Sequence, residues 1–93
     1  MKKIDYKNIP NCLRKYRRAR GLKQKEVAEI LGLKSTSMIS RWEKGICLPS
    51  PLIILKLALV YRTLVDALFI DLVRFLKEEL LKREEEVLKQ KNG

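Results

Sequence analysis

The residues best suited to recognise a partner by its hydrogen-bonding groups and methyl groups lie on one side of a helix expected over residues 36–44. Met38, Ile39 and Trp42 mark its apolar side, because their spacing places them on one helical face. The opposite side then carries Thr36, Ser37, Ser40, Arg41 and Lys44. An arginine in such a row can donate two parallel hydrogen bonds to O6 and N7 of guanine. A threonine can offer its methyl group to thymine, whereas a serine can bond many bases and specifies little.

Basic residues surround this helix and are spread unevenly along the 93-residue chain of net charge +10. Residues 1–62 carry 15 Lys or Arg against 4 Asp or Glu, whereas residues 63–93 carry 6 against 7. A basic segment followed by a near-neutral one is typical of a polyanion-binding module with an appended element. Lys23, Lys25, Lys34 and Lys44 are the lysines expected to contact phosphate groups. The alternative is that these charges only keep a small protein in solution.

Capping residues and glycines divide the sequence into short helices. The Asn-Ile-Pro-Asn segment at residues 8–11 predicts a first helix that runs to Arg20, because asparagine caps helices and proline fits the first turn. Gly21, Gly32 and Gly45 are expected to end successive helices. Further helices are expected over residues 24–31, 36–44, 51–61, 65–69 and 70–89. In the helix over residues 24–31, the side chains expected to point inward are Val27, Ala28, Ile30 and Leu31.

Two short helices joined by a tight turn inside a helical bundle describe a helix-turn-helix. The sequence closely resembles the phage repressor and Cro family of helix-turn-helix proteins, the xenobiotic-response-element regulators, over about residues 9–69. The resemblance rests on Leu22–Ala28 followed by Leu31-Gly32, then on Ile39–Gly45 and Pro49-Ser50. It implies an all-α fold: a five-helix, repressor-like DNA-binding bundle over residues 9–69. Residues 1–8 would form an arm, and residues 70–93 a C-terminal amphipathic helix.

The resemblance also assigns roles to individual residues. Positions matching Thr36, Ser37 and Arg41 read bases in this family. Gln24 would bind a backbone phosphate at the start of its helix, where exposed N–H groups and the helix dipole favour an anion. Arg17 would pair with Glu43 and hold the first helix against the recognition helix. The expected phosphate contacts are Lys23, Gln24, Lys25, Lys34, Ser40 and Lys44.

Two positions depart from the family pattern. The turn Leu33–Ser35 is one residue longer than usual, so the assignment of Thr36 and Ser37 can shift by one position. Arg62 stands where the family often has glycine.

The last segment carries an apolar series with 4–3–4–7 spacing, interrupted by Arg83: Phe69, Val73, Leu76, Leu80 and Val87. Such a series is typical of a short coiled-coil seam. A helix this short and apolar must pack on something, so these residues are expected to form a homodimer interface. The alternative is that the helix folds back on its own domain. A twofold dimer would place two recognition helices about one DNA turn apart on a near-palindromic operator.

The sequence therefore predicts a cytoplasmic, sequence-specific regulator of transcription, a repressor or autoregulator that binds double-stranded DNA and needs no cofactor. One alternative is an antitoxin whose C-terminal helix binds a toxin protein; another is an interaction module that no longer binds DNA. No enzyme is expected, because the chain has no histidine and no phosphate-cradling glycine loop. Cys12 and Cys47 form no CxxC pair, so no usual metal site is expected. Charged residues interrupt the apolar stretch 52–69, which makes it a poor membrane span.

Overall fold

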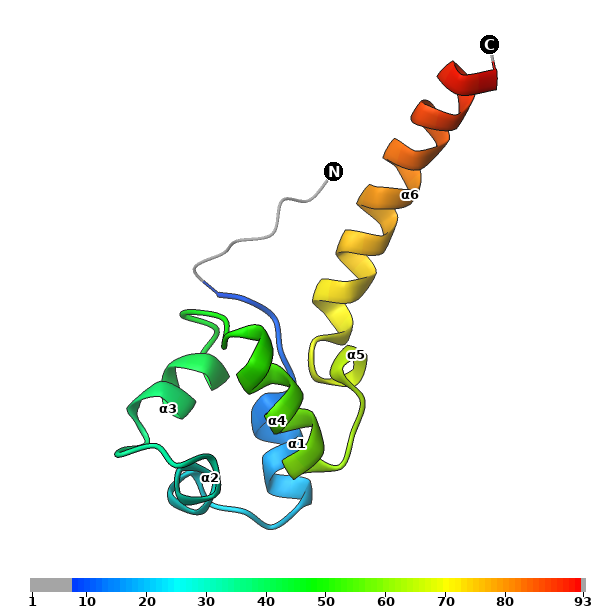
Figure 1. Cartoon of the computed structure of the whole chain (residues 1–93). Helices are drawn as coiled ribbons and strands as arrows, with labels where there is room; N and C mark the ends of the chain where they lie inside the picture. The colour runs from blue at the N-terminus through cyan, green and yellow to red at the C-terminus, as the bar shows by residue number, and fades with distance from the viewer. Residues whose placement is uncertain (1–7, 93) are drawn as a thin grey trace.

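The structure, a computed structural model, describes residues 8–92, and within this range it is all-helical. The expected arm over residues 1–8 falls, apart from Asn8, outside the described residues. The helices are α1 (Leu13–Ala19), α2 (Gln24–Leu31), α3 (Ser37–Glu43), α4 (Pro51–Tyr61), α5 (Val65–Leu68) and α6 (Ile70–Asn92). Helices α1–α5 surround one core, and α6 projects away from them, so the molecule measures 56 × 24 × 21 Å (Figure 1).

Local capping explains where most helices begin and end. The expectation for α4 is confirmed, because the Ser50 hydroxyl accepts a hydrogen bond from the Ile53 N–H at 3.3 Å and Pro51 opens the first turn. The expectation for α1 is wrong at its start, since the helix begins at Leu13 rather than beside Pro10. Here the Asn11 carboxamide oxygen accepts the Leu13 N–H at 3.1 Å, so Asn11 rather than Asn8 satisfies the first turn.

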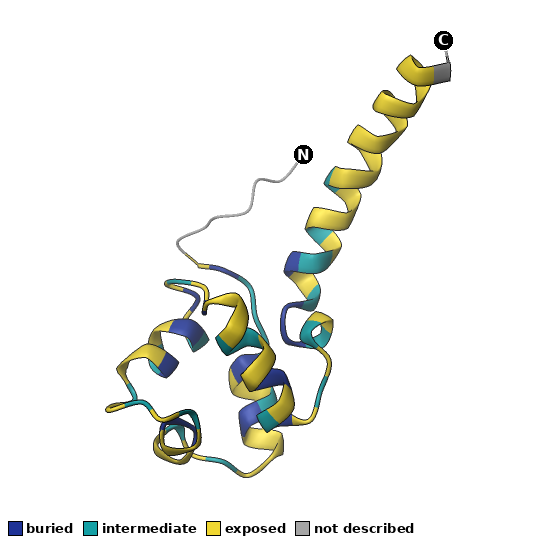
Figure 2. Cartoon of the chain, in the orientation of Figure 1, coloured by how far each residue is buried: buried dark blue, intermediate teal, exposed yellow. Residues whose placement is uncertain are grey.

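The core lies where the inner faces of the helices meet, and Figure 2 shows the buried residues gathered there. Its members are Ile9, Leu13, Val27, Ala28, Ile39, Trp42, Leu57, Ala58, Tyr61, Leu68, Phe69 and Leu72. Two residues expected to point inward do not: Met38 is 42 % exposed and Ile30 is 57 % exposed. Ile30 in α2 and Met38 in α3 each lie at the edge of their helix's apolar face, and the neighbouring helices cover only part of that face.

Phe69 is a core residue, so its expected place in a dimer interface is wrong. Its backbone angles of φ −131° and ψ 41° break the helix between α5 and α6, and the residue is only 5 % exposed. The helical periodicity of α6 therefore starts after Phe69. The first turn of α6 still belongs to the domain, because Leu72 is buried and Val73 packs against the core. Most side chains beyond Phe75 are exposed.

Gly45 allows the end of α3 to lie directly against the segment before α1. The Ile9 N–H donates to the Gly45 carbonyl at 2.8 Å, and Gly45 has φ 76°. A Cβ atom at this position would lie 2.5 Å from the Ile9 carbonyl oxygen. Only glycine combines this backbone conformation with this close approach.

Arg62 adopts the left-handed conformation that glycine would adopt without strain. It is the C-cap of α4, with φ 54° and ψ 49°. We expect Arg62→Gly to raise the free energy of unfolding by about 1 kcal/mol and the melting temperature by about 4–8 °C. Arg62→Ala is the matched control, because it removes the same charge but keeps the Cβ atom. Equal stability changes in the two variants would show that the backbone is not the cause.

Candidate nucleic-acid interface

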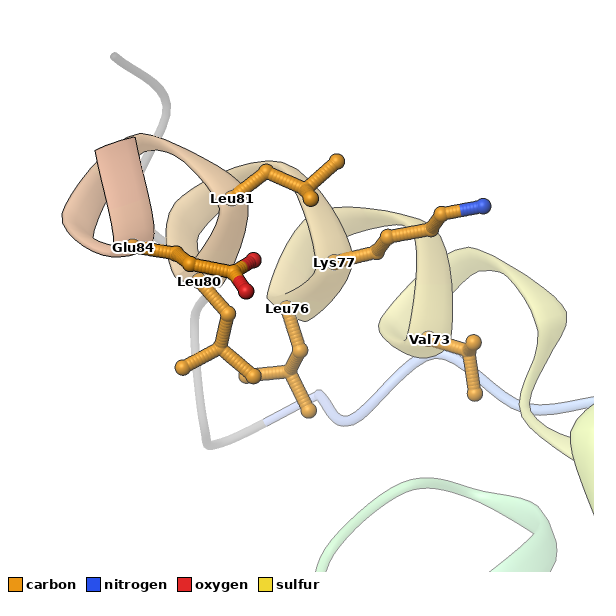
Figure 3. Close-up of a pocket in the computed structure, with 6 residues that line it drawn as sticks. All are labelled: Val73, Leu76, Lys77, Leu80, Leu81 and Glu84. Atoms are coloured by element: carbon orange, nitrogen blue, oxygen red, sulfur yellow. The ribbon is translucent and has the colours of Figure 1, made fainter. Parts of the chain in front are cut away.

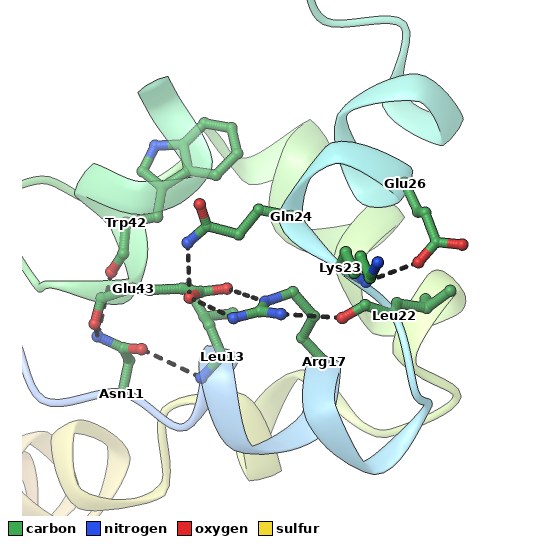
Figure 4. Close-up of polar contacts among 9 residues, drawn as sticks. All are labelled: Asn11, Leu13, Arg17, Leu22, Lys23, Gln24, Glu26, Trp42 and Glu43. Atoms are coloured by element: carbon green, nitrogen blue, oxygen red, sulfur yellow. Dashed lines mark hydrogen bonds and ion pairs between the residues drawn. The ribbon is translucent and has the colours of Figure 1, made fainter. Parts of the chain in front are cut away.

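The carboxylate of Glu43, at the last residue of α3, joins three helices. Arg17 of α1 donates from Nε to Oε2 at 2.6 Å and from Nη2 to Oε1 at 3.1 Å. Gln24, the first residue of α2, donates from Nε2 to Oε1 at 3.0 Å. Figure 4 shows these side chains converging on the carboxylate. Because both arginine bonds are charge-assisted and parallel, they fix the orientation of α1 relative to α3.

This ion pair is shielded from solvent. The side chains of Arg17 and Glu43 are 10 % and 5 % exposed. The hydrogen bonds that Arg17 donates to the Glu43 carboxylate raise the pKa of Arg17 above its already high ordinary value, so the guanidinium stays charged. Burial, with a further contribution from the charge of Glu43, raises the pKa of the nearby Tyr61 to about 12. Arg17 also donates from Nη1 to the Leu22 carbonyl at 2.9 Å, which holds the turn between α1 and α2.

Asn11 attaches the end of α3 to the start of α1. Its Nδ2 lies 3.1 Å from the Trp42 carbonyl oxygen and 3.3 Å from the Glu43 carbonyl oxygen. The last carbonyls of a helix lack partners within it, so this side chain supplies donors that α3 itself cannot provide. The sequence identified asparagine only as a helix cap and missed this second role.

The outward face of α3 and its C-cap carries four residues at the spacing of one helical side: Ser37, Ser40 and Arg41 in the helix, and Lys44 at the C-cap. Ser37 and Arg41 are exposed, whereas Ser40 is half-buried. Ser35 precedes this face, and its hydroxyl donates to the Ser37 hydroxyl at 3.0 Å and accepts the Ser37 N–H at 3.3 Å. Thr36 is the N-cap residue and is half-buried, to one side of this face.

A shallow polar hollow lies between α1, α2 and α3, beside this face. Its lining residues are Arg14, Arg17, Gln24, Ser40, Glu43 and Lys44. The structure thus brings together Gln24, Ser40 and Lys44, three of the residues expected to contact phosphate. Arg14 was missed as a member, although its place one helical turn before Arg17 indicates the same side of α1.

Some of the remaining basic residues lie exposed near this face, whereas others make contacts within the bundle. Lys23 and Lys25 are exposed at the start of α2, and Lys34 is exposed in the turn before α3. Arg20, in contrast, donates from Nε to the Val60 carbonyl at 3.1 Å and so connects the end of α1 to α4. Met38, which is 42 % exposed, lies one turn before Arg41 and Trp42, at the margin of the outward face of α3.

The second and third helices, joined by a short turn and fixed to the first, define this protein as a helix-turn-helix protein. The sequence matches the family described as helix-turn-helix over residues 13–68. The chain belongs to this family, in its Cro/C1 type, and is a DNA-binding regulator. Searches of curated proteins and of solved structures give no significant match.

Among residues 8–92, no group of three His, Cys, Asp or Glu side chains is arranged to hold a metal ion. No helix in that range is both long and apolar enough to cross a membrane.

Removing the negative charge of Glu43 should destabilise the whole bundle. Glu43→Gln keeps an acceptor oxygen but leaves the buried Arg17 without a counter-charge, which should lower the free energy of unfolding by about 3 kcal/mol. Urea denaturation at neutral pH measures this loss. Glu29→Gln, on the exposed surface of α2, is the control and should change stability by less than about 0.5 kcal/mol. Similar losses in both variants would mean that the ion pair does not hold the helices.

Proposed function

We propose that the protein is a sequence-specific regulator of transcription, a repressor or autoregulator, that inserts α3 into the major groove of double-stranded DNA. The observation that carries this proposal is the division of α3 into two faces. Ile39 and Trp42 are buried and Glu43 is clamped, while Ser37 and Arg41 stay exposed. Because its buried side is fixed by core packing and an ion pair, α3 can present its outer side chains to base edges in one register.

Base recognition is proposed for Thr36, Ser37 and Arg41. Arg41 has the largest discriminating power, because its guanidinium can bond O6 and N7 of guanine together. Ser37 is presented at the first turn, beside Thr36, whose methyl group suits a thymine. Met38 extends this set, since its exposed side chain lies next to Arg41 and can also contact a thymine methyl group.

Phosphate contacts are proposed for the residues around the polar hollow. Gln24 uses its amide nitrogen to reach Glu43, so one of its N–H bonds remains for a phosphate at the N-terminus of α2. Lys23, Lys25, Lys34, Ser40 and Lys44 are proposed to contact the same backbone, and Arg14 joins them.

A homodimer on a near-palindromic operator is proposed from the apolar surface of α6. Val73, Leu76, Leu80 and Val87 lie on the projecting helix, and the last three are exposed. Pairing would remove this surface from water and bring two recognition helices to one DNA site. No cofactor is required for this binding mode, and the cytoplasm is its proposed location.

A protein partner is the second candidate function, as in an antitoxin that binds a toxin. It is favoured by α4, where Leu52, Leu55 and Leu59 are 62 %, 56 % and 78 % exposed and share one helical side. Together with the leucines of α6, this surface exceeds what DNA binding alone requires.

Replacing Arg41 tests the proposed base recognition. Arg41→Ala should reduce the preference for DNA upstream of the protein's own gene over a scrambled duplex by about 5- to 150-fold, the cost of one lost bidentate base contact. Fluorescence anisotropy at fixed salt measures both affinities. Arg74→Ala, on α6, is the matched control and should leave the preference unchanged. An unaltered preference in Arg41→Ala would refute the assignment of α3 as the reading helix.

Replacing Lys44 tests the proposed phosphate contacts. Lys44→Ala should weaken binding to both duplexes by similar factors and reduce the slope of log K against log salt by about one. A titration at several salt concentrations measures the slope. A loss confined to the specific duplex would instead make Lys44 a base-reading residue.

A further inference from the structure

Two opposite charges interrupt the apolar face of α6. Figure 3 shows Lys77 and Glu84 between Leu81 on one side and Leu76 and Leu80 on the other. Val73, which packs against the core near the start of α6, borders the same surface. Lys77 and Glu84 therefore lie along the middle of the face of α6 that would be buried in the proposed homodimer.

Lys77 and Glu84 are separated by two helical turns. Seven residues rise about 10.5 Å along an α-helix and return to nearly the same side. This separation is too long for an ion pair within one helix, and neither side chain has an ion-pair partner among the described residues. Covering the face would take both charges out of water, which is unfavourable unless each meets an opposite charge.

The direction of pairing decides which charges meet. In a parallel, in-register pair, Lys77 would face Lys77 of the second copy and Glu84 would face Glu84, so both contacts would be repulsive. In an antiparallel pair centred between Leu80 and Leu81, each Lys77 faces Glu84 of the second copy. The same register places Leu80 against Leu81 and Val73 against Leu88.

We propose that α6 pairs with α6 of a second copy in antiparallel orientation, with two Lys77–Glu84 ion pairs around a twofold axis between Leu80 and Leu81. This inference rests on the proposed homodimer and specifies its geometry. The overlap from Val73 to Leu88 spans about 24 Å and covers the exposed apolar residues of α6. The two DNA-binding bundles then lie at opposite ends of the helix pair, because each α6 is rooted in its own core at Leu72.

Charge reversal tests the orientation. Lys77→Glu and Glu84→Lys should each weaken dimerisation at least about tenfold, because each turns both ion pairs into like-charge contacts. The double variant Lys77→Glu/Glu84→Lys should dimerise within about threefold of the unaltered protein, since it restores opposite charges. Sedimentation equilibrium of the full chain measures these constants without DNA. Lys82→Glu and Glu78→Lys, away from the apolar face of α6, are the matched controls and should have little effect.

The outcomes separate this inference from the proposed function. Single variants that dimerise like the unaltered protein would overturn the antiparallel arrangement. In a parallel pair, like charges face each other both before and after each substitution, so dimerisation would change little. A chain that stays monomeric at tens of micromolar would overturn both the pairing and the homodimer. Specific DNA binding, measured on the same samples, would test the role of α3 independently.

Cross-linking gives a second, geometric measurement. In a chain with Cys12 and Cys47 replaced by alanine, Lys77→Cys mixed with Glu84→Cys should form a disulfide between the two variants when a mild oxidant such as oxidised glutathione is added. Neither variant alone should cross-link to itself, because like positions would lie about 10.5 Å apart along the axis, beyond disulfide reach. Self-cross-linking of each variant would establish parallel pairing and refute the proposal.

Discussion

The buried charge of Glu43 is the constraint on which the rest of the bundle depends. The charge of a carboxylate shielded from water must be compensated, and the three hydrogen bonds that Glu43 accepts are donated by Arg17 and Gln24, on two other helices. Compensation and assembly are therefore one event: the charge is satisfied only when α1, α2 and α3 meet in their final arrangement. Such a group adds little net stability compared with an apolar substitute, but it disfavours alternative packings.

The short helices need this arrangement because none can be stable alone. α3 has 7 residues, which is too few for an isolated helix in water. Its order comes from Ile39 and Trp42 in the core and from Asn11 at its last carbonyls. The exposed side of α3 can carry residues chosen for a partner rather than for folding, because the buried side supplies the stability.

The sequence predicted the fold class and most helix positions because these depend on local signals such as Ser50 and Pro51 at the start of α4. It did not predict the exposure of Ile30 and Met38, since periodicity identifies an apolar side but not how far neighbouring helices cover it. The prediction that Phe69 lies in a homodimer interface failed for a related reason. It assumed one continuous helical periodicity from Phe69 onward, and the helix is broken at this residue. Long-range contacts, such as those of Asn11, leave no local pattern. The pairing of Arg17 with Glu43 came from family resemblance alone.

Because its first turn packs against the core of the bundle, α6 acts as a lever arm. Its 23 residues extend about 34 Å, and its first turn is fixed in the core by Leu72. Rotating such a rod by about 10°, well within the scatter of helix crossing angles, displaces its far end by about 6 Å, nearly two base-pair steps. In the proposed dimer, the separation and phase of the two DNA half-sites would then be set by side chains that never approach DNA. Changes in the packing of two helices could retarget such a regulator to a differently spaced operator while every base-reading residue stayed the same.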